Sequence, residues 1–256
     1  MANNKNARRS EIPNLLLENP NLRNEDFAKH FGVTLETIRS DMIYLEQKGI
    51  VHKLHGHAEV TDSFRRDKIH LNDRAHLDEK AKLAVAEAAL GFIKNDSVIF
   101  LDSGSTVQKI AELLSQRSHI TVITNSLKVA NTIIEQEQNQ VYLASGFVSA
   151  SGMLLNGPYL IDSIKQFKYN FAFLGTNGLK FYDGPTCLNY SHVPVKQLVI
   201  QNSEHVAVVC SSSKFADGAV MQFASWDEID YLITDAIPEE QREKIQKSDV
   251  QCVLAN

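Results

Sequence analysis

Two apolar patterns of helical period stand in the first 60 residues. Phe27 and Phe31, four residues apart, predict a short helix. Gly32 is expected to end that helix, because a residue without Cβ easily adopts the left-handed conformation of a tight turn. Thr34 then suits the N-cap of a second helix, with its hydroxyl accepting a hydrogen bond from the backbone N–H of Thr37.

The second predicted helix has one buried side, made by Ile38, Met42 and Leu45, and it is expected to end at Gly49. Its outward side consists of Leu35, Glu36, Thr37, Arg39, Ser40 and Ile43. A helix that presents its N-terminal turn outward fits the major groove of duplex DNA. The pattern therefore predicts a helix-turn-helix, although plain three-helix packing produces the same pattern.

Residues 50–60 alternate apolar and polar around His55-Gly56-His57, which predicts a two-stranded wing. The wing is expected to lie against the sugar-phosphate backbone, whereas Arg39 is the strongest candidate for reading a base. The predicted DNA-binding residues are Thr34, Leu35, Glu36, Thr37, Arg39 and Ser40 on the helix, and Lys53, His55 and Gly56 on the wing.

After residue 77, short apolar runs alternate with helical patterns. The predicted strands are residues 98–101, 120–124, 141–144, 171–174, 206–210 and 231–233, and the predicted helices are 78–93, 107–114, 127–135, 195–201 and 239–246. Buried strands separated by helices indicate a mainly parallel sheet covered on both faces. The predicted fold class is α/β, with an N-terminal winged helix-turn-helix domain (1–60), a charged linker (61–77) and a larger doubly wound α/β domain (78–256).

Small polar residues follow several predicted strands, at the edge of the sheet where ligands collect. The run 102–106 also precedes a helix, where backbone N–H groups, hydroxyls and the helix dipole favour an anion. The candidate ligand residues are Asp102, Ser103, Gly104, Ser105, Thr106, Asn125, Ser126, Gly146, Thr176, Asn177, Gly178, Lys196 and Lys214. A phosphorylated ligand suits this set, and a solvated surface role is the alternative for each lysine.

Composition agrees with a soluble, intracellular chain. Of the 256 residues, 43% are hydrophobic, which is enough for a sizeable core. No apolar run approaches the roughly 18 residues that span a bilayer, and the polar residues 1–10 are not expected to be a secretory signal. Cys187, Cys210 and Cys252 lack metal-ligand spacing, so reduced thiols and no metal or cofactor are predicted.

The net charge of −5 is the observation that fits DNA binding least. Residues 1–60 contain eight Lys and Arg and eight Asp and Glu. Because non-specific affinity grows with the number of neutralised phosphates, one such domain should bind DNA weakly. We therefore expect a dimer or tetramer that places two domains on two half-sites.

Short motifs follow one another in a characteristic order along the whole chain. They are Val33-Thr34, Thr37-Ile38-Arg39, Asp41, Leu45-Glu46, Gly49-Ile50, His55-Gly56 and Ala58, then LDSGSTV (101–107), TNSLKVA (124–130), FLGTNG (173–178), Val195-Lys196, SSKF (212–215) and IDYLITD (229–235). In this order the chain resembles the DeoR family of bacterial sugar-metabolism repressors.

The resemblance implies a DNA-binding regulator, most plainly a repressor of a carbohydrate operon, and no enzyme. It also implies that the second domain is similar to ribose-phosphate isomerases and CoA transferases and binds a phosphosugar that changes operator affinity. Several residues depart from the family pattern: Ser40 replaces an arginine, His57 a glycine, Asn170, Asn177 and Ser211 aspartates, and His192 a glutamate. The identity of the effector is therefore not carried over.

Two other hypotheses remain open from the sequence. One is an isomerase-like enzyme with an accessory DNA-binding domain, in which Asp102 or Asp183 would be the base that removes a proton next to a carbonyl. The other is a DNA-binding protein whose α/β domain only holds an oligomer together.

Overall fold

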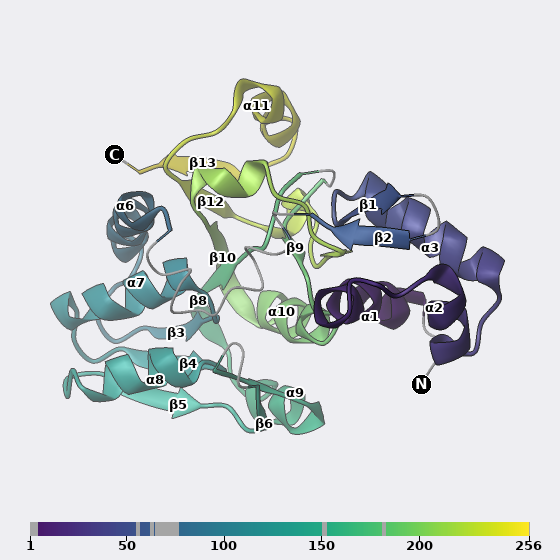
Figure 1. The fold of residues 1–256 in the computed structure, drawn as a ribbon. Helices are drawn as coiled ribbons and strands as arrows, with labels where there is room; N and C mark the ends of the chain where they lie inside the picture. Colours follow the sequence, from purple (N-terminus) through teal and green to yellow (C-terminus); the bar gives the residue numbers. More distant parts are fainter. Residues whose placement is uncertain are drawn as a thin grey trace.

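The computed structural model describes residues 5–54, 57–61, 64, 77–149, 153–180 and 183–255. Its N-terminal domain consists of α1 (Lys5–Glu18), α2 (Asn24–Phe31), α3 (Leu35–Gln47) and the antiparallel strands β1 (Val51–Leu54) and β2 (His57–Val60). Gly32 has a φ of 62°, and the Thr34 hydroxyl accepts from the Thr37 N–H at 3.2 Å. The predicted winged helix-turn-helix is thereby confirmed (Figure 1).

Helix α1 was not expected from the sequence. It contains Pro13, yet Arg8, Arg9 and Ser10 are buried in it. The Nε atoms of Arg8 and Arg9 each donate to one carboxylate oxygen of Asp41 on α3, both at 2.6 Å. A buried polar segment thus attaches α1 to the back of the second helix of the motif.

A parallel sheet of seven strands forms the centre of the second domain. The strands are β3 (Val98–Leu101), β4 (Thr121–Thr124), β5 (Gln140–Leu143), β8 (Tyr169–Gly175), β10 (Ser203–Val209), β12 (Tyr231–Thr234) and β13 (Gln251–Leu254), in the order β13-β12-β10-β8-β3-β4-β5. The chain builds outward from β3 to β5 and then returns to β8, beside β3. The strand order therefore reverses between β3 and β8, where open α/β sheets bind ligands.

Helices cover both faces of this sheet. They are α6 (Glu79–Leu90), α7 (Ser105–Leu113), α8 (Leu127–Ile134), α9 (Pro158–Ile164), α10 (His192–Gln201) and α11 (Glu239–Gln246). Apolar residues of α6, α7 and α8 share one core with the sheet, and those of α9 and α10 belong to a second core. The doubly wound α/β fold is confirmed (Figure 1).

Two small antiparallel pairs complete the second domain. Strands β6 (Phe147–Ser149) and β7 (Leu154–Asn156) form one pair, and β9 (Thr186–Cys187) and β11 (Met221–Gln222) form the other. Together with β13 and α9, these pairs were not predicted. No helix in the described part of the chain is long and apolar enough to cross a membrane.

The two domains are in contact. The Ser10 hydroxyl donates to the carbonyl of Leu188 at 3.0 Å, and the Tyr44 hydroxyl donates to the carbonyl of Val220 at 3.2 Å. Apolar residues of α1, α2 and α3 also belong to the same core as α9 and α10. Of the predicted linker, residues 62–63 and 65–76 lie outside the described residues, while Phe64 is buried.

Candidate functional site

A cavity of about 380 Å³ opens at the carboxyl ends of β3 and β8, where the strand order reverses. Its described lining is Leu77, Asp78, Lys82, Asp102, Ser103, Gly104, Ser105, Thr106, Val107, Leu154, Gly175, Thr176, Asn177, His192, Lys196, Val209, Cys210, Ser211, Ser213, Lys214, Ala216 and Asp217. These residues come from both halves of the sheet. Such a volume suits a small metabolite.

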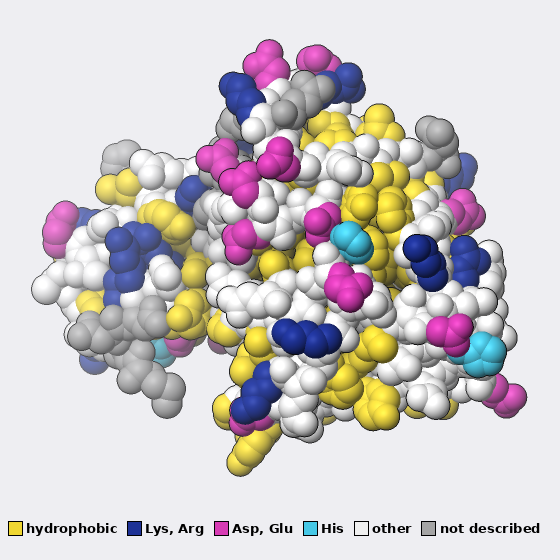
Figure 2. All heavy atoms as spheres, turned by 180° about the vertical axis from the view of Figure 1, so that it is seen from behind, with side chains coloured by type: hydrophobic (Ala, Val, Ile, Leu, Met, Phe, Trp, Pro, Cys, Tyr) yellow, Lys and Arg dark blue, Asp and Glu magenta, His cyan; other side chains and the backbone are white. Residues whose placement is uncertain are grey.

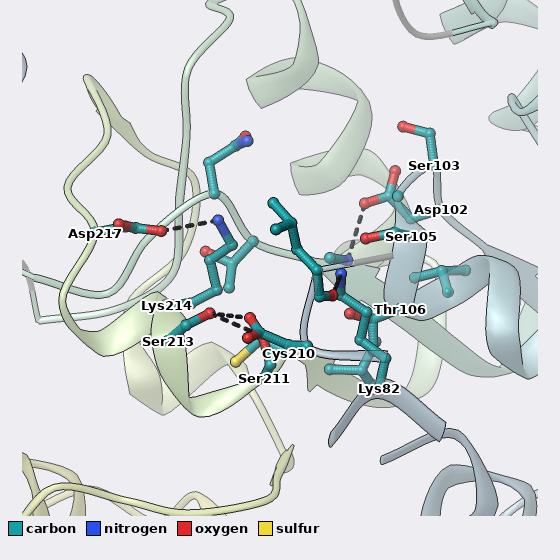
Figure 3. A pocket seen from close by; sticks show the side chains of 18 of the residues that line it. Lys82, Asp102, Ser103, Ser105, Thr106, Cys210, Ser211, Ser213, Lys214 and Asp217 are labelled. Carbon is teal, nitrogen blue, oxygen red and sulfur yellow. Dashed lines mark hydrogen bonds and ion pairs between the residues drawn. The ribbon is translucent and has the colours of Figure 1, made fainter. Parts of the chain in front are cut away.

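The run 102–106 forms one wall of the cavity (Figure 3). Helix α7 starts at Ser105 because Val107, Ile110 and Ala111 give it a fully buried face. Gly104 precedes the helix with a φ of 140°, and no side chain in the described part of the chain caps the helix. The N–H groups of a first helical turn have no partner within the helix, so the uncapped end offers several donors and a positive dipole end to a ligand.

A buried ion pair between Lys196 and Asp102 lies beside this wall. Lys196 on α10 is 6% exposed and Asp102 is 4% exposed, and the Lys196 Nζ donates to the Asp102 Oδ2. Nζ also donates to the carbonyl of Gly175 at 2.8 Å, and the Gly175 N–H donates to the same Asp102 oxygen at 3.0 Å. The end of β8, the end of β3 and the middle of α10 are thus tied together at one point.

Lys214 lies across the cavity from this wall (Figure 3). Its Nζ is 2.9 Å from a carboxylate oxygen of Asp217. Nearby, Asp78 accepts hydrogen bonds from the hydroxyls of Ser213, at 2.7 Å, and Ser211, at 3.1 Å. The hydrogen bond from Ser213 is the main reason that the pKa of Asp78 lies below its usual value. Asp78 therefore remains a carboxylate at neutral pH.

Charges in the described lining are balanced. The three lysines, Lys82, Lys196 and Lys214, face three aspartates, Asp78, Asp102 and Asp217. His192, at the start of α10, also reaches the cavity. Cys210 lines it as well, but burial raises the pKa of its thiol to about 12, so the thiol stays protonated at neutral pH. Asp183, the other base considered above, is exposed and is not in the described lining.

The structure brings together nine of the predicted ligand residues, namely Asp102, Ser103, Gly104, Ser105, Thr106, Thr176, Asn177, Lys196 and Lys214. It places Asn125, Ser126, Gly146 and Gly178 outside the described lining. Ser126 caps α8 by accepting from the Val129 N–H at 3.3 Å. A Cβ on Gly146 would lie 2.4 Å from the Asn156 carbonyl oxygen, and one on Gly178 would lie 2.3 Å from that of Asp217, so close backbone packing accounts for both glycines.

Six lining residues with charged, imidazole or hydroxyl side chains were not among the predicted ligands: Asp78, Lys82, His192, Ser211, Ser213 and Asp217. Asp78 and Lys82 belong to the start of α6, far from the strand-end motifs in sequence. Lys214 and Ser211 do stand in or beside the SSKF motif, so their neighbours Ser213 and Asp217 could have been included on that signal.

The predicted DNA-binding residues of α3 lie at the surface. Arg39 and Glu36 are exposed, with Nη1 of the arginine 3.6 Å from the Glu36 carboxylate, and Thr34 and Ser40 are exposed as well. Leu35 and Thr37 are half-buried. On the wing, Lys53 is exposed beside Glu46, and the predicted residues His55 and Gly56 lie outside the described residues.

The departures from the family pattern also have defined positions. Asn170 lies at the start of β8, where its side chain accepts from the Val98 N–H at 3.0 Å and donates to Glu204 at 3.0 Å. Asn170 therefore links β8 to both neighbouring strands, β3 and β10. Asn177 lines the cavity, and its side-chain oxygen accepts from the Leu188 N–H at 3.3 Å. Asn177 therefore connects the cavity to Leu188, whose carbonyl accepts the hydrogen bond from Ser10 of the N-terminal domain.

Two sequence profiles match the chain. The DeoR-like helix-turn-helix domain matches residues 8–64, and the DeoR C-terminal sensor domain matches residues 77–236. The chain belongs to the DeoR family. As a DeoR-family protein it is a DNA-binding transcription regulator with a sensor domain, and not an enzyme.

Known DeoR-type proteins are similar to this chain over nearly their whole length. The glycerol-3-phosphate regulon repressor of Escherichia coli (strain K12) is 31% identical over 233 residues, which are 90% of this chain and 91% of that protein. The putative aga operon transcriptional repressor of Escherichia coli O157:H7 is 27% identical, covering 96% and 93%. The lactose phosphotransferase system repressor of Staphylococcus epidermidis is 28% identical, covering 95% and 97%.

Among solved structures, a ribose-5-phosphate isomerase in complex with phospho-erythronic acid matches 54% of either chain, with a TM-score of 0.41 and 19% identity. That likeness is too low to bear on the ligand of this DeoR-family sensor domain.

Proposed function

We propose that this DeoR-family regulator is a repressor of a carbohydrate-metabolism operon, whose affinity for operator DNA changes when a phosphorylated sugar or polyol binds the cavity. The observation that carries this proposal is the uncapped N-terminus of α7 in the wall of a cavity that three lysines also line. The names of the relatives support it, because they refer to repressors of glycerol-3-phosphate, aga and lactose systems.

In this proposal the phosphate lies on the backbone N–H groups of Gly104, Ser105 and Thr106, with the hydroxyls of Ser103 and Ser105 as further donors. Lys214 takes the phosphate as a partner in addition to Asp217, since a charge-assisted hydrogen bond to a dianion is strong in a partly buried site. Lys82, Thr176 and Asn177 complete the set of ligand residues. The candidates outside the described lining are left out of it.

On the DNA side, Arg39 is the proposed base-reading residue. It projects from the outward face of α3, and its only ion pair in the described part of the chain is an exposed one with Glu36, which DNA displaces at little cost. Thr34, Leu35, Glu36, Thr37 and Ser40 surround it, and Lys53, His55 and Gly56 are proposed to contact the phosphate backbone.

A dimer or tetramer in the cytoplasm is part of the same proposal. Figure 2 shows Lys and Arg side chains interspersed with Asp and Glu over one face of the molecule, so attraction to DNA does not come from one large basic surface on that face. Two DNA-binding domains on linked half-sites compensate for weak attraction by each. Light scattering should therefore give a dimer or larger at micromolar concentration, and a monomer that binds its operator tightly would contradict this part of the proposal.

The effector is tested by thermal shift with the full chain. Glycerol 3-phosphate, glucose 6-phosphate, inorganic phosphate and the unphosphorylated compounds are each added at increasing concentration. At least one phosphorylated compound should raise the melting temperature, because a ligand that binds only the folded state stabilises it. The same compound should change the operator concentration needed for half-saturation. Stabilisation by the unphosphorylated compounds alone would overturn the assignment of the cavity to a phosphate.

A further inference from the structure

We infer that Asp102 recognises a hydroxyl group of the effector close to its phosphate, and that Lys196 is the residue that positions Asp102 for this task. The inference rests on the proposed function and specifies it further, since it divides the cavity into a phosphate end and a hydroxyl end. It also gives Lys196 a role different from the cation role expected from the sequence.

Lys196 is already fully engaged. Its Nζ donates to Asp102 Oδ2 and to the Gly175 carbonyl, and it lies 4.6 Å from the centre of the Phe223 ring. Its side chain is 7% exposed. To bind a phosphate, the ammonium group would have to leave a buried carboxylate, which would then remain uncompensated at high cost. The lysine therefore acts on the ligand through Asp102.

Asp102 presents one oxygen to the cavity. Its Oδ2 accepts from Lys196 and from the Gly175 N–H. Its Oδ1 accepts no hydrogen bond from the described residues. This atom is also not among their fully buried side-chain oxygens that lack a partner, so it is accessible from the cavity that Asp102 lines. A carboxylate accepts hydrogen bonds and donates none. The ligand atom that meets this oxygen must therefore carry a hydrogen, which a phosphate dianion does not.

The same small molecule reaches both ends. Asp102 and Ser105 are three peptide units apart, so their Cα atoms are separated by at most about 11 Å. The free oxygen of Asp102 cannot donate to a phosphate dianion, so the phosphate lies at the α7 end, where N–H groups point, and a hydroxyl lies at the Asp102 end. The fitting ligand class is a phosphate monoester of a polyol or sugar with a hydroxyl a few bonds from the ester.

The test compares hydroxylated phosphates with a phosphate that lacks hydroxyls. The full chain is titrated calorimetrically with glycerol 3-phosphate, glucose 6-phosphate and propyl phosphate, which keeps the ester and a three-carbon chain. The wild-type protein should bind at least one hydroxylated compound about tenfold or more tightly than propyl phosphate, because a hydrogen bond to a charged group has that worth.

Asp102→Asn should abolish most of this preference by weakening the hydroxylated compound, while propyl phosphate binds as before or more tightly. The preference is the informative readout, since damage to the fold would weaken both compounds together. If Asp102→Asn keeps the preference, or weakens both compounds equally, the role given to Asp102 is wrong.

Lys196→Met tests the positioning role. It should lower the same preference, and Asp102→Asn should cause no further loss in the Lys196→Met background, because the two residues act as one unit. The double variant removes both buried charges and so serves if a single variant does not fold. Additive losses in the double variant would overturn the positioning role.

Failure of the proposed function looks different. If no phosphate compound binds the wild-type protein, including propyl phosphate and inorganic phosphate, the phosphate assignment falls and the inference falls with it. If propyl phosphate binds as tightly as the hydroxylated compounds, phosphate sensing stands and only the role of Asp102 is rejected.

Discussion

Ion pairs on the proposed DNA-binding face of α3 and in the cavity differ in exposure and therefore in what they do. On α3, the side chains of Arg39 and Glu36 are 58% and 82% exposed, and they approach to 3.6 Å. In the cavity, those of Lys196 and Asp102 are 7% and 6% exposed. An exposed pair contributes only about 0–1 kcal/mol, so its members exchange partners freely. A buried pair fixes geometry instead.

The two domains therefore suit different kinds of recognition. The proposed DNA-binding face offers loosely held charges, which the phosphates and bases of an operator would take over. The cavity offers groups that are already oriented, so a ligand must match them. A third pair, between Asp41 and the two arginines of α1, is as buried as the cavity pair but lies behind the DNA-binding face. Its function is to hold α3 in place.

The largest effect is expected from breaking that third pair. Asp41→Asn leaves two buried guanidinium groups without their carboxylate, and the free energy of unfolding of the N-terminal domain should fall by about 3–5 kcal/mol. Urea unfolding followed by circular dichroism measures the loss. Glu36→Gln on the exposed face of α3 is the matched control and should change stability by less than about 0.5 kcal/mol. Equal effects of the two changes would erase the distinction between buried and exposed pairs.

Gly104→Val should separate effector binding from DNA binding. A Cβ at Gly104 meets no described atom within 4 Å, so the side chain extends into open space at the phosphate end, while the φ of 140° strains a β-branched residue. The backbone strain costs about 1–3 kcal/mol of stability. The valine side chain also blocks the approach of the phosphate to the loop. The variant should lose the effector response in an operator-binding assay and keep its affinity without effector. A normal response would remove the loop from the mechanism.

Replacements on the DNA-binding face should distinguish a base contact from a phosphate contact. Arg39→Ala should weaken specific operator binding by about 1–3 kcal/mol, whereas Lys53→Ala should weaken all DNA nearly uniformly and flatten the salt dependence. Fluorescence anisotropy with operator and with unrelated DNA, at several salt concentrations, measures both. If both variants bind operator like the wild type, the proposed docking of α3 is wrong.

The smallest effect concerns the contact between the domains. Tyr44→Phe removes the hydroxyl that donates to the Val220 carbonyl, and the coupling between effector and operator should fall by about 0.5–1.5 kcal/mol. Effector titrations with and without saturating operator give that coupling, which must be the same in both directions. Tyr159→Phe, at an exposed position on α9, is the control and should leave the coupling unchanged. An unchanged coupling in Tyr44→Phe would assign signal transfer to other contacts.

The sequence predicted the elements that depend on local pattern. Period and capping residues were sufficient for α2, α3 and the central strands, because a buried apolar face and a cap such as Thr34 are local properties. Helix α1 escaped prediction for the opposite reason. Arginines such as Arg8 and Arg9 are usually solvated, so the local pattern does not predict their burial. Their partner, Asp41, is more than thirty positions away in the sequence.

The candidate site was predictable in part for a similar reason. The motif at 102–106 follows the strand at the point where the order reverses, and loops at such points meet the ligand. Asn125 and Ser126 follow β4, one strand farther from that point, and lie outside the described lining. Asp78 and Lys82 reach the cavity from α6 through packing that no strand-end pattern reveals.

The burial of Arg8 and Arg9 has a practical consequence for anyone who dissects this protein. A fragment that starts at α2 would contain every residue of the helix-turn-helix motif. It would lack Arg8 and Arg9, however, so the Asp41 carboxylate would lose both of its partners. Such a fragment should melt at a lower temperature and bind operator poorly even though its DNA-facing residues are intact. A DNA-binding fragment of this chain therefore has to begin no later than Lys5, where α1 starts. Loss of DNA binding after removal of α1 would show that α3 is no longer held in place, and would not show that α1 contacts DNA.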